Sequence, residues 1–476
     1  MNPPSSAVQV LVEILPGAVE RILKNTKMKS LLLAFVVLTV TSPLFAQSAT
    51  INWTTTYQTM DGWGASTGYN ERNTNLTAAQ ADCFFSVTTG SCITGNIGLE
   101  YIRIQDNTIP ASAPDLPTLL LAVARGTKVF LSFNGPQLDS GSYASQAAYM
   151  VAKTQFFISQ GVPIATISPM NEPVNSGTSA AALDTFIASY LQPALTAAGL
   201  SIPITLGEGV EWFTTDYVTP CMNDTNCKPF VTTVAGHDYG TGSVDGFGFV
   251  GTEQCCSTYT PPPSSAAGKK VWMTEVQGGF NGPCASDSGS STFDSSMPDA
   301  LVWAHNIHDF LTVAGGSSWQ YWNLAAETSH GLPDCNDGLT SSTYVPTQRY
   351  YAVGNWSKFV RNGWVRIDAT ANPASGIYVS AFKDTSSGNF AIVAINQNSS
   401  PSTVAFSLAA FPSVTSVTPT VTSASINLVD QVNATVSGGA FSYSLPATSV
   451  TTFRGTASAT SPTIPLPPTN LTESVH

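Results

Sequence analysis

The chain has 476 residues, of which 43% are hydrophobic and only 10% are charged, and its formal net charge is −12. This length and apolar content allow a barrel with an appendage or more than one domain. The negative charge argues against nucleic acids and anionic membrane surfaces as partners, because both are bound through positive patches. A neutral or weakly charged polymer remains compatible with this surface.

Residues 1–46 have the pattern of a secretory signal. An apolar run at 31–40 is followed by Ala46, a small residue suited to the cleavage site, and is preceded by Lys24, Lys27 and Lys29. The run is too short for a stable membrane-spanning helix. We therefore expect a secreted protein that starts at Met28 and loses this region.

The eight cysteines of an exported chain are expected to form disulfides. Cys83 and Cys92 bracket one short loop, and Cys221 and Cys227 bracket another. The spacing does not assign the other four, which are Cys255, Cys256, Cys284 and Cys335. A zinc site is the alternative, but the spacings lack paired C-x-x-C motifs.

Residues 60–356 alternate short apolar runs with longer alanine-rich ones, after a strand-like segment within 47–59. The strand-like runs are 99–104, 128–133, 165–169, 202–206, 232–235, 270–274 and 317–321. The helix-like runs are 79–85, 115–124, 145–160, 179–198 and 297–314. This alternation predicts a parallel sheet, and about eight such units close into a (β/α)8 TIM barrel of the α/β class.

The pattern changes at residues 357–456, where strands follow one another with period two. They are expected at 364–369, 377–382, 390–396, 403–408, 440–445 and 449–453. Such strands predict an antiparallel β-sandwich side domain, which the run at 50–58 can join. Trp356, Phe359 and Trp364 are expected to pack at its junction with the barrel. Residues 457–476 are rich in Pro, Thr and Ser and are expected to be disordered.

Two glutamates stand at the ends of apolar, strand-like runs. Glu172 follows Asn171 after residues 164–170, and Glu275 follows residues 271–274. In a barrel, function gathers where the strands end, so both carboxylates are expected at one edge. A pair of carboxylates there is the equipment for cutting a glycosidic bond, one as acid and base and the other as nucleophile. The alternative is that each merely binds loop amides.

With these residues in view, the chain resembles glycoside hydrolase family 30 over nearly its whole mature length. The segments that carry the resemblance are 61–64, Asn171-Glu172-Pro173, Thr274-Glu275, 358–370, 378–381 and 449–453. The last three resemble side-domain strands of the bacterial glucuronoxylanase branch. The resemblance implies a retaining mechanism with Glu172 as acid/base and Glu275 as nucleophile. No metal or organic cofactor is expected, because carboxylates fill both roles.

The resemblance also implies supporting residues around the two glutamates. Arg103 is expected beside Glu275, where it would keep that carboxylate ionised. The remaining implied substrate-site residues are Asn171, which would contact a sugar hydroxyl, His237, Tyr239, Trp63, Trp319 and Trp322. The tryptophans are expected to stack on sugar rings, with packing in the core as the alternative for each. For His237, a purely structural role is the alternative.

Three departures from the glucuronoxylanase branch bear on the substrate. That branch has tandem arginines after its last barrel strand, whereas residues 323–330 here offer no cation except His330, and Glu327 would disfavour an acidic side group. Residues 133–136 replace a tryptophan-rich turn. Cysteine-bearing insertions at 83–92, 221–227 and 252–290 are expected to reshape the rim of the cleft.

The sequence therefore predicts a secreted, monomeric, retaining endo-β-1,4-xylanase that acts on a plant cell-wall polysaccharide and does not strictly require glucuronate. A family 30 β-1,6-galactanase or β-1,6-glucanase is the alternative within the class. A non-catalytic carbohydrate-binding protein on the same scaffold is the alternative from another class, and a purely structural cell-surface protein would leave the acidic pair unexplained.

Overall fold

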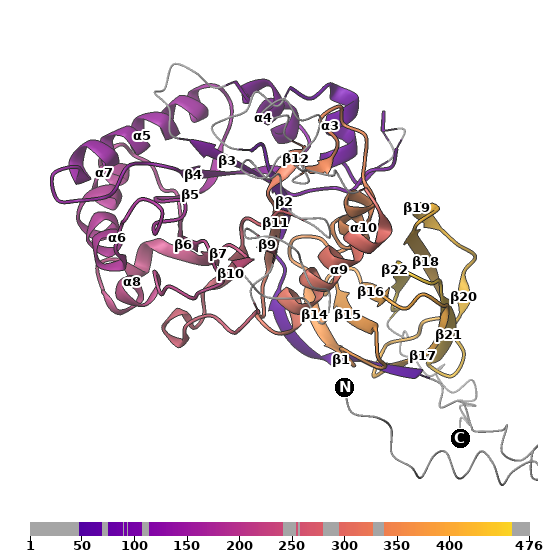
Figure 1. The fold of residues 1–476 in the computed structure, drawn as a ribbon. Coiled ribbons are helices and arrows are strands. Elements are labelled where there is room, and N and C mark those ends of the chain that lie inside the picture. Colours follow the sequence, from indigo (N-terminus) through magenta and orange to yellow (C-terminus); the bar gives the residue numbers. More distant parts are fainter. Residues whose placement is uncertain are drawn as a thin grey trace, which may run out of the picture. The chain divides into compact units, whose positions relative to one another are not determined.

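The computed structural model describes residues 47–68, 75–88, 90–92, 94–106, 114–240, 254–255, 258–278, 295–326 and 338–458 (Figure 1). The expected signal region and residues 459–476 of the expected C-terminal tail lie outside these residues. Ala457 and Ser458, the first two residues of that tail, are ordered, because their backbone N–H groups donate to Gly388 at 2.9 Å and to Ser413 at 3.0 Å. The described residues from Ser48 onward belong to one compact unit. Among them, no helix is long and apolar enough to cross a membrane.

Eight parallel strands close into the expected barrel, in the order β10-β11-β2-β3-β4-β5-β6-β7. Their bounds are β2 Gly62–Ser66, β3 Tyr101–Asp106, β4 Lys128–Phe133, β5 Ile164–Ser168, β6 Ile204–Gly209, β7 Val231–Gly236, β10 Lys270–Met273 and β11 Ser318–Tyr321. Two small pairs lie outside the barrel, β8 Tyr239–Gly240 with β9 Gln254–Cys255 and β12 Asn323–Ala325 with β13 Gly338–Thr340. Since parallel strands all end at one edge, the barrel brings the C-terminal residues of distant segments together.

Helices connect the strands and pack around them. They are α3 Ala78–Phe85, α4 Leu116–Val123, α5 Tyr143–Ser159, α6 Ala180–Phe186, α7 Gln192–Ala197, α8 Thr219–Asn223, α9 Met297–Thr312 and α10 Gln348–Ser357, with short 3-10 turns at Lys228–Phe230 and Ser264–Ala266. The single helix expected at 179–198 is divided by a π turn at Ile187–Leu191. Pro193 is the second residue of α7, and because proline has no N–H it cannot continue the regular ladder of helical hydrogen bonds.

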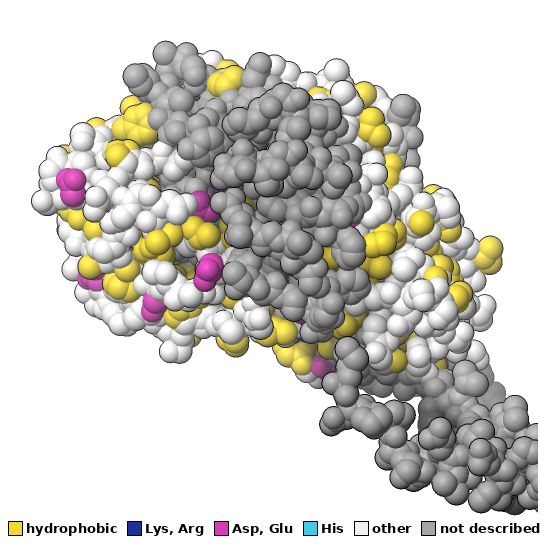
Figure 2. Space-filling view, viewed as in Figure 1, with side chains coloured by type: hydrophobic (Ala, Val, Ile, Leu, Met, Phe, Trp, Pro, Cys, Tyr) yellow, Lys and Arg dark blue, Asp and Glu magenta, His cyan; other side chains and the backbone are white. Residues whose placement is uncertain are grey.

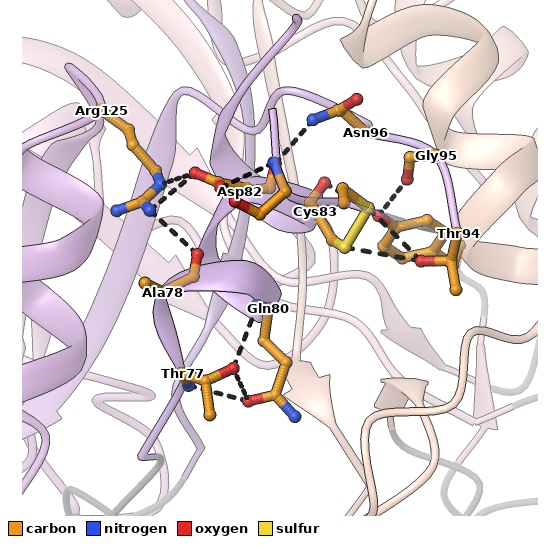
Figure 3. The surroundings of a disulfide bond; sticks show 12 residues. Thr77, Ala78, Gln80, Asp82, Cys83, Thr94, Gly95, Asn96 and Arg125 are labelled. Atoms are coloured by element: carbon orange, nitrogen blue, oxygen red, sulfur yellow. Dashed lines mark hydrogen bonds and ion pairs between the residues drawn. A yellow bond between two sulfur atoms is a disulfide. The ribbon is translucent and has the colours of Figure 1, made fainter. Parts of the chain in front are cut away.

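Both predicted disulfides, Cys83–Cys92 and Cys221–Cys227, are present. Figure 3 shows the first, which ties the loop after α3 back to the helix; beside it Asp82 accepts a hydrogen bond from Arg125 at 2.7 Å. The side chain of Cys255 and all of Cys256, Cys284 and Cys335 lie outside the described part of the chain.

The expected effect of two cysteine-bearing insertions on the cleft rim is wrong. Residues 83–92 lead from α3 toward β3, and residues 221–227 lead from α8 toward β7. Connections from a helix to the next strand lie at the edge where barrel strands begin, opposite the edge where they end. The two disulfides therefore brace the far side of the barrel. Of the third insertion, 252–290, residues 252–253, 256–257 and 279–290 lie outside the described residues.

The side domain is one continuous sheet in the order β19-β18-β22-β16-β15-β14-β1-β17-β21, with β20 paired to β18. The bounds are β1 Gln47–Thr59, β14 Val365–Ala369, β15 Ile377–Lys383, β16 Asn389–Asn396, β17 Ser402–Ala409, β18 Ser416–Ser423, β19 Ile426–Asp430, β20 Ala434–Thr435, β21 Ala440–Leu445 and β22 Ser449–Thr456. The sheet curls over its own apolar core, which includes Ile51, Ile392, Phe406, Phe441 and Phe453. As expected, β1 joins this domain, pairing antiparallel with β14.

Helices α9 and α10 of the barrel pack on the side domain, as Figure 1 shows beside β15, β16 and β18. Trp356 of α10 is fully buried, and its ring N–H donates to Ser380 at 3.3 Å. Asn355 donates to Thr422 at 2.7 Å and accepts from Thr452 through its backbone oxygen at 2.7 Å. Phe359 and Trp364, also expected at this junction, are partly buried.

We expect deletion of residues 364–456 to give insoluble protein with no cooperative thermal transition. The deletion would uncover the apolar surface of α10 around Val353 and Trp356 and remove the side-domain hydrogen-bond partners of the buried Asn355 amide, Thr422 and Thr452. Removal of residues 459–476 alone is the control. Recovery of a folded, active barrel from the larger deletion would show that the side domain is dispensable.

Candidate active site

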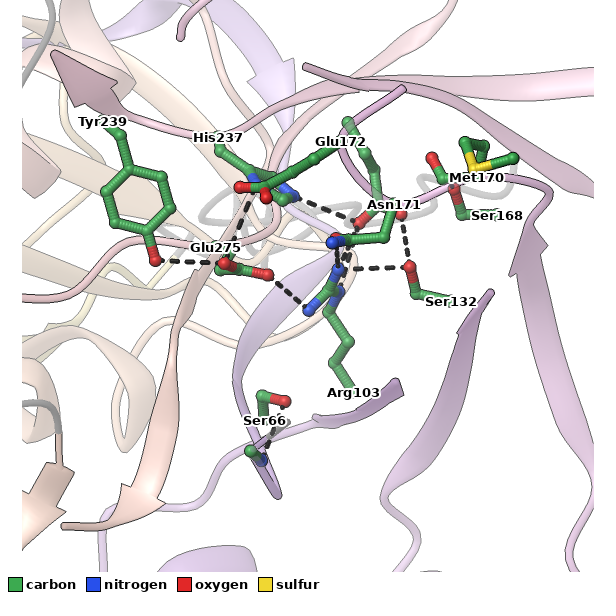
Figure 4. Close-up of polar contacts among 12 residues, drawn as sticks. Ser66, Arg103, Ser132, Ser168, Met170, Asn171, Glu172, His237, Tyr239 and Glu275 are labelled. Atoms are coloured by element: carbon green, nitrogen blue, oxygen red, sulfur yellow. Dashed lines mark hydrogen bonds and ion pairs between the residues drawn. The ribbon is translucent and has the colours of Figure 1, made fainter. Parts of the chain in front are cut away.

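The two predicted carboxylates meet at the edge where the barrel strands end (Figure 4). Glu172 follows β5 and Glu275 follows β10. One carboxylate oxygen of each lies within 4.8 Å of the other and of a ring nitrogen of His237. Retaining glycosidases hold their carboxyl groups about 5–5.5 Å apart, whereas inverting ones need roughly 6.5 Å or more to admit a water molecule. The measured proximity fits the retaining geometry.

Arg103, on β3, lies fully buried beneath this pair and contacts Glu275, as the sequence predicted. Its guanidinium donates to Glu275 Oε2 at 2.8 Å and to Asn171 Oδ1 at 2.6 Å. It also donates to Ser132 Oγ at 3.1 Å. Because the group has no exposed surface, it acts on the carboxylate and the amide and offers no face to substrate. Its expected place among the substrate-contacting residues is therefore wrong.

Burial and charge oppose each other at Glu275. Burial raises the pKa of Glu275, while Arg103 and His237 lower it and the neighbouring carboxylates of Glu172 and Glu208 raise it further. The net pKa lies above the ordinary value for glutamate. Arg103 thus has the expected sign of effect, but it offsets burial only in part. Tyr239 supplies another stabilising contact, since its hydroxyl donates to Glu275 Oε1 at 3.0 Å.

The backbone at Glu172 is held in an unusual conformation. Its φ is 44°, in the left-handed region that non-glycine residues seldom adopt. Its N–H donates to the backbone oxygen of Glu208 at 3.0 Å, and that of Asn171 donates to Phe133 at 2.6 Å. These bonds to neighbouring strands fix the turn. The Glu172 side chain is 17% exposed and accepts from Asn175 at 2.7 Å, so its carboxylate can reach substrate.

His237 lies behind Glu172 and has no exposed surface. Its Nδ1 is 3.0 Å from Glu172 Oε1 and 3.8 Å from Glu275 Oε1. Burial by itself would lower the pKa of His237, but Glu275, Glu172 and Glu208 together raise it to about 9. The imidazole is therefore a cation at neutral pH. Its predicted contact with substrate is wrong, because the surrounding carboxylates enclose it.

Glu208 and Ser132 belong to the same cluster and were not predicted from the sequence. Glu208 is the penultimate residue of β6, is fully buried, accepts from Ser132 at 2.6 Å and forms an ion pair with Arg103 at 3.0 Å. Burial alone would raise the pKa of Glu208, but Arg103 and His237 hold it well below its usual range. The available signal was a glutamate at the end of the apolar run 202–206, as at Glu172 and Glu275.

Two of the three tryptophans expected to stack on sugars lie in the core. The side chains of Trp63 and Trp319 have no exposed surface. The ring of Trp63 donates to the backbone of Val360 at 2.7 Å, and that of Trp319 donates to Asn306 at 2.8 Å. Their prediction as sugar platforms is wrong, because side chains alternate along a strand and these two point out of the barrel toward its helices.

Trp322 lies at the site, as predicted. It follows β11, and its ring centre is 6.0 Å from the Arg103 guanidinium carbon. At the same barrel edge, residues 133–136 with Ser145, Gln146 and Tyr149 line a hollow of about 240 Å³. Residues 133–136 thus border an open hollow at the place where the glucuronoxylanase branch is expected to have a tryptophan-rich turn.

Glu172, His237 and Glu275 are also residue types that can hold a metal ion. Here their contacting atoms are engaged with one another and with Arg103, whose charge already balances Glu275. A second cation in this cluster would lie against the guanidinium and the imidazolium, which is electrostatically unfavourable. The donor set therefore suits proton transfer and covalent chemistry better than metal binding.

The proteins to which the chain is similar are named as xylanases and glucuronoxylanases. No family model matches the chain. Glucuronoxylanase XynC of Bacillus subtilis strain 168 is 29% identical over 449 residues, which cover 89% of this chain and 96% of the relative. The structure of Xyn30A from Clostridium acetobutylicum, a xylanase of glycoside hydrolase family 30 subfamily 8, is 26% identical and covers 87% of this chain and all of its own, with a TM-score of 0.69. A family 30 endoxylanase from Clostridium papyrosolvens C71, 24% identical, shares the fold with a TM-score of 0.68 over 86% of this chain and all of its own.

A barrel with paired carboxylates at its C-terminal edge, similar over nearly its whole length to such enzymes, is a glycoside hydrolase. More narrowly, the chain belongs to glycoside hydrolase family 30, close to the bacterial glucuronoxylanases and the subfamily 8 xylanases.

Proposed function

We propose that the protein is a secreted, endo-acting, retaining β-glycanase whose substrate is β-1,4-xylan. The observation that carries the mechanism is the proximity of Glu172 and Glu275, within 4.8 Å, with Arg103 on one and His237 on the other. The substrate rests on the likeness to glucuronoxylanase XynC and to Xyn30A. On the face shown in Figure 2, acidic side chains are scattered among uncharged ones, which suits a neutral polymer.

In the proposed first step, the Glu275 carboxylate attacks the anomeric carbon while Glu172 protonates the departing oxygen. The glycosidic bond breaks and a glycosyl ester forms on Glu275. Glu172, now ionised, then takes a proton from water, whose oxygen displaces Glu275 from the anomeric carbon. The two displacements restore the original configuration.

Three further residues at the site have supporting roles in this proposal. Asn171 is 5% exposed and its amide is oriented by Arg103, so it can contact the hydroxyl next to the anomeric carbon. Hydrogen bonds to that hydroxyl strengthen in the transition state. Trp322 offers an aromatic edge at the strand end, and Tyr239 orients the nucleophile.

We further propose that a glucuronate side group is not strictly required. Residues 323–326 hold no cation, while Glu327 and His330 lie outside the described residues. Arg349 is no replacement, because it is fully buried, is paired with Asp299 at 2.8 Å and donates to the hydroxyl of Tyr321. A bidentate arginine contact with a carboxylate is worth about 1.5–3 kcal/mol, and roughly each 1.4 kcal/mol changes a rate tenfold.

Kinetics on glucuronoxylan, arabinoxylan and linear xylohexaose test the substrate proposal. We expect kcat/KM on glucuronoxylan to exceed that on xylohexaose by less than about tenfold. The reason is that glucuronoxylan gains no arginine contact that the undecorated xylohexaose would lack. A preference of a hundredfold or more for glucuronoxylan over xylohexaose would show that another cation binds the glucuronate carboxylate. Cleavage of β-1,6-galactan or β-1,6-glucan in place of xylan would support the alternative substrate, and binding of glycans without release of reducing sugar would support a binding protein.

A further inference from the structure

Glu208 is placed behind the two candidate catalytic glutamates and has no access to substrate. Its side chain is fully buried, and Ser132 donates to its Oε2 at 2.6 Å while Arg103 donates to Oε1 at 3.1 Å. On the third side, His237 Nε2 is 3.6 Å from Oε1. A buried carboxylate in apolar surroundings would be costly, but this one is enclosed by one hydroxyl and two cations.

The local backbone is built to point this side chain inward. Glu208 has a φ of 48°, and the pairing of β6 with β7 shifts register between Gly207 and Gly209. Gly207 allows the bulge, because a Cβ there would lie 2.2 Å from the backbone oxygen of Ala235. Bulges of this kind re-aim a side chain near active sites, and strained residues persist only where the surroundings hold them.

We propose that Glu208 is a positioning residue for the reaction, a buried carboxylate that fixes the orientation of Arg103 and of His237. Arg103 then presents its fork to Glu275 and Asn171, and His237 presents Nδ1–H to Glu172. This inference rests on the proposed retaining mechanism.

The reaction itself explains why a fixed anion is useful. During the first step, the negative charge leaves Glu275 as the ester forms and appears on Glu172 as that group gives up its proton. His237 lies between the two, at 3.0 Å from one and 3.8 Å from the other. Glu208 takes no part in the transfer, so its charge faces Arg103 and His237 in every state. Arg103 and His237 therefore keep their positions while the negative charge shifts from Glu275 to Glu172.

The test replaces Glu208 by Gln, which keeps the shape and removes the charge. We expect kcat to fall by roughly ten- to a hundredfold with KM changed less than about threefold, because the catalytic groups would be misplaced while the contacts with substrate remain. In NMR titration, the midpoint of His237, whose pKa is about 9 in the native protein, should fall toward its ordinary 6.5. Glu172, Glu275 and Arg103 are the other charged groups facing His237 and are unchanged in the variant.

Two further variants separate positioning from stability. Glu208→Asp retains the charge and should restore the His237 midpoint, even if it only partly restores kcat. Asp299→Asn breaks a buried ion pair with Arg349 away from the site, and should lower the thermal midpoint without moving His237 or kcat. Unchanged kcat and an unchanged His237 midpoint in Glu208→Gln would overturn the proposal. The NMR readout needs no substrate, so inactivity of the native protein on all glycans would contradict the proposed function separately.

Discussion

Replacement of Glu275 by Ala is expected to abolish turnover on every substrate, with a loss in kcat of roughly 10⁴-fold or more, as for other nucleophile deletions. No other described carboxylate can take its place, because Glu208 is enclosed by Arg103 and Ser132. Initial rates on xylan and on an aryl xyloside measure the effect. Glu211, an exposed glutamate at the same barrel edge, provides the control, and Glu211→Ala should stay near the native rate.

Replacement of Glu172 by Ala should give a different pattern, which assigns the two roles. Aryl glycosides carry good leaving groups that need no proton, so part of the first step should survive on them while xylan cleavage is lost. Azide should then raise the rate, because a small anion can enter the vacated space and attack the ester on Glu275. The product, a β-glycosyl azide, is identified by NMR. Near-native activity of Glu275→Ala, or azide rescue of that variant to a β-glycosyl azide, would reverse the assignment, because a true nucleophile deletion allows only direct displacement by azide to an α-product.

The barrel and its acidic pair could be predicted because both leave local signals. An apolar run that ends in a glutamate predicts a strand, its burial and the position of the carboxylate at the end of that strand, as at Glu172 and Glu275. β4 matches its expected bounds of 128–133, since its apolar residues are followed directly by Asn134 and Gly135. The short spacing of Cys83 and Cys92 likewise made their disulfide predictable.

Predictions were wrong or missing mainly where they depended on whether a strand side chain points into the barrel or out toward its helices. Trp63 and Trp319 are the second residues of β2 and β11 and do not lie where these strands end. A shift of one residue along a strand decides whether a side chain faces the inside of the barrel or its helices, and the sequence does not mark this shift. The position of Glu208 after an apolar run was visible in the sequence, but the inward direction of its side chain was not, because that direction depends on the register shift between β6 and β7. β18 was not predicted. It lies between β19 and β22 and contains Pro419, a residue type that is unusual in a central strand because it cannot donate a backbone hydrogen bond.

The last expectation concerns acid stability at the junction of the two domains. His308 of α9 is 3% exposed and its ring centre is 5.4 Å from that of Tyr378 on β15. Burial, with His305 and Arg366 nearby as like charges, lowers the pKa of His308 from 6.5 to about 3. In the unfolded chain the residue takes up a proton below about pH 6.5, whereas the folded protein resists it until about pH 3. The unfolded state therefore binds more protons in this window, and stability falls as the pH falls.

This difference predicts a loss of about 1.4 kcal/mol per pH unit between pH 6.5 and 3, and on the order of several kcal/mol in all. In His308→Gln the contribution of this imidazole to the loss should be absent, so the free energies of unfolding of variant and native protein should converge and then cross as the pH falls. Urea unfolding at pH 7, 6, 5 and 4 measures both. Tyr378→Phe is the control, because it keeps the ring and leaves His308 in place. If the free energy of unfolding depends on pH in the same way in native protein and in His308→Gln, the prediction is wrong. The imidazole would then take up its proton in the folded protein without disturbing the junction. The carboxylates cannot produce the predicted crossing, since Glu208 and the other acidic groups titrate alike in both proteins.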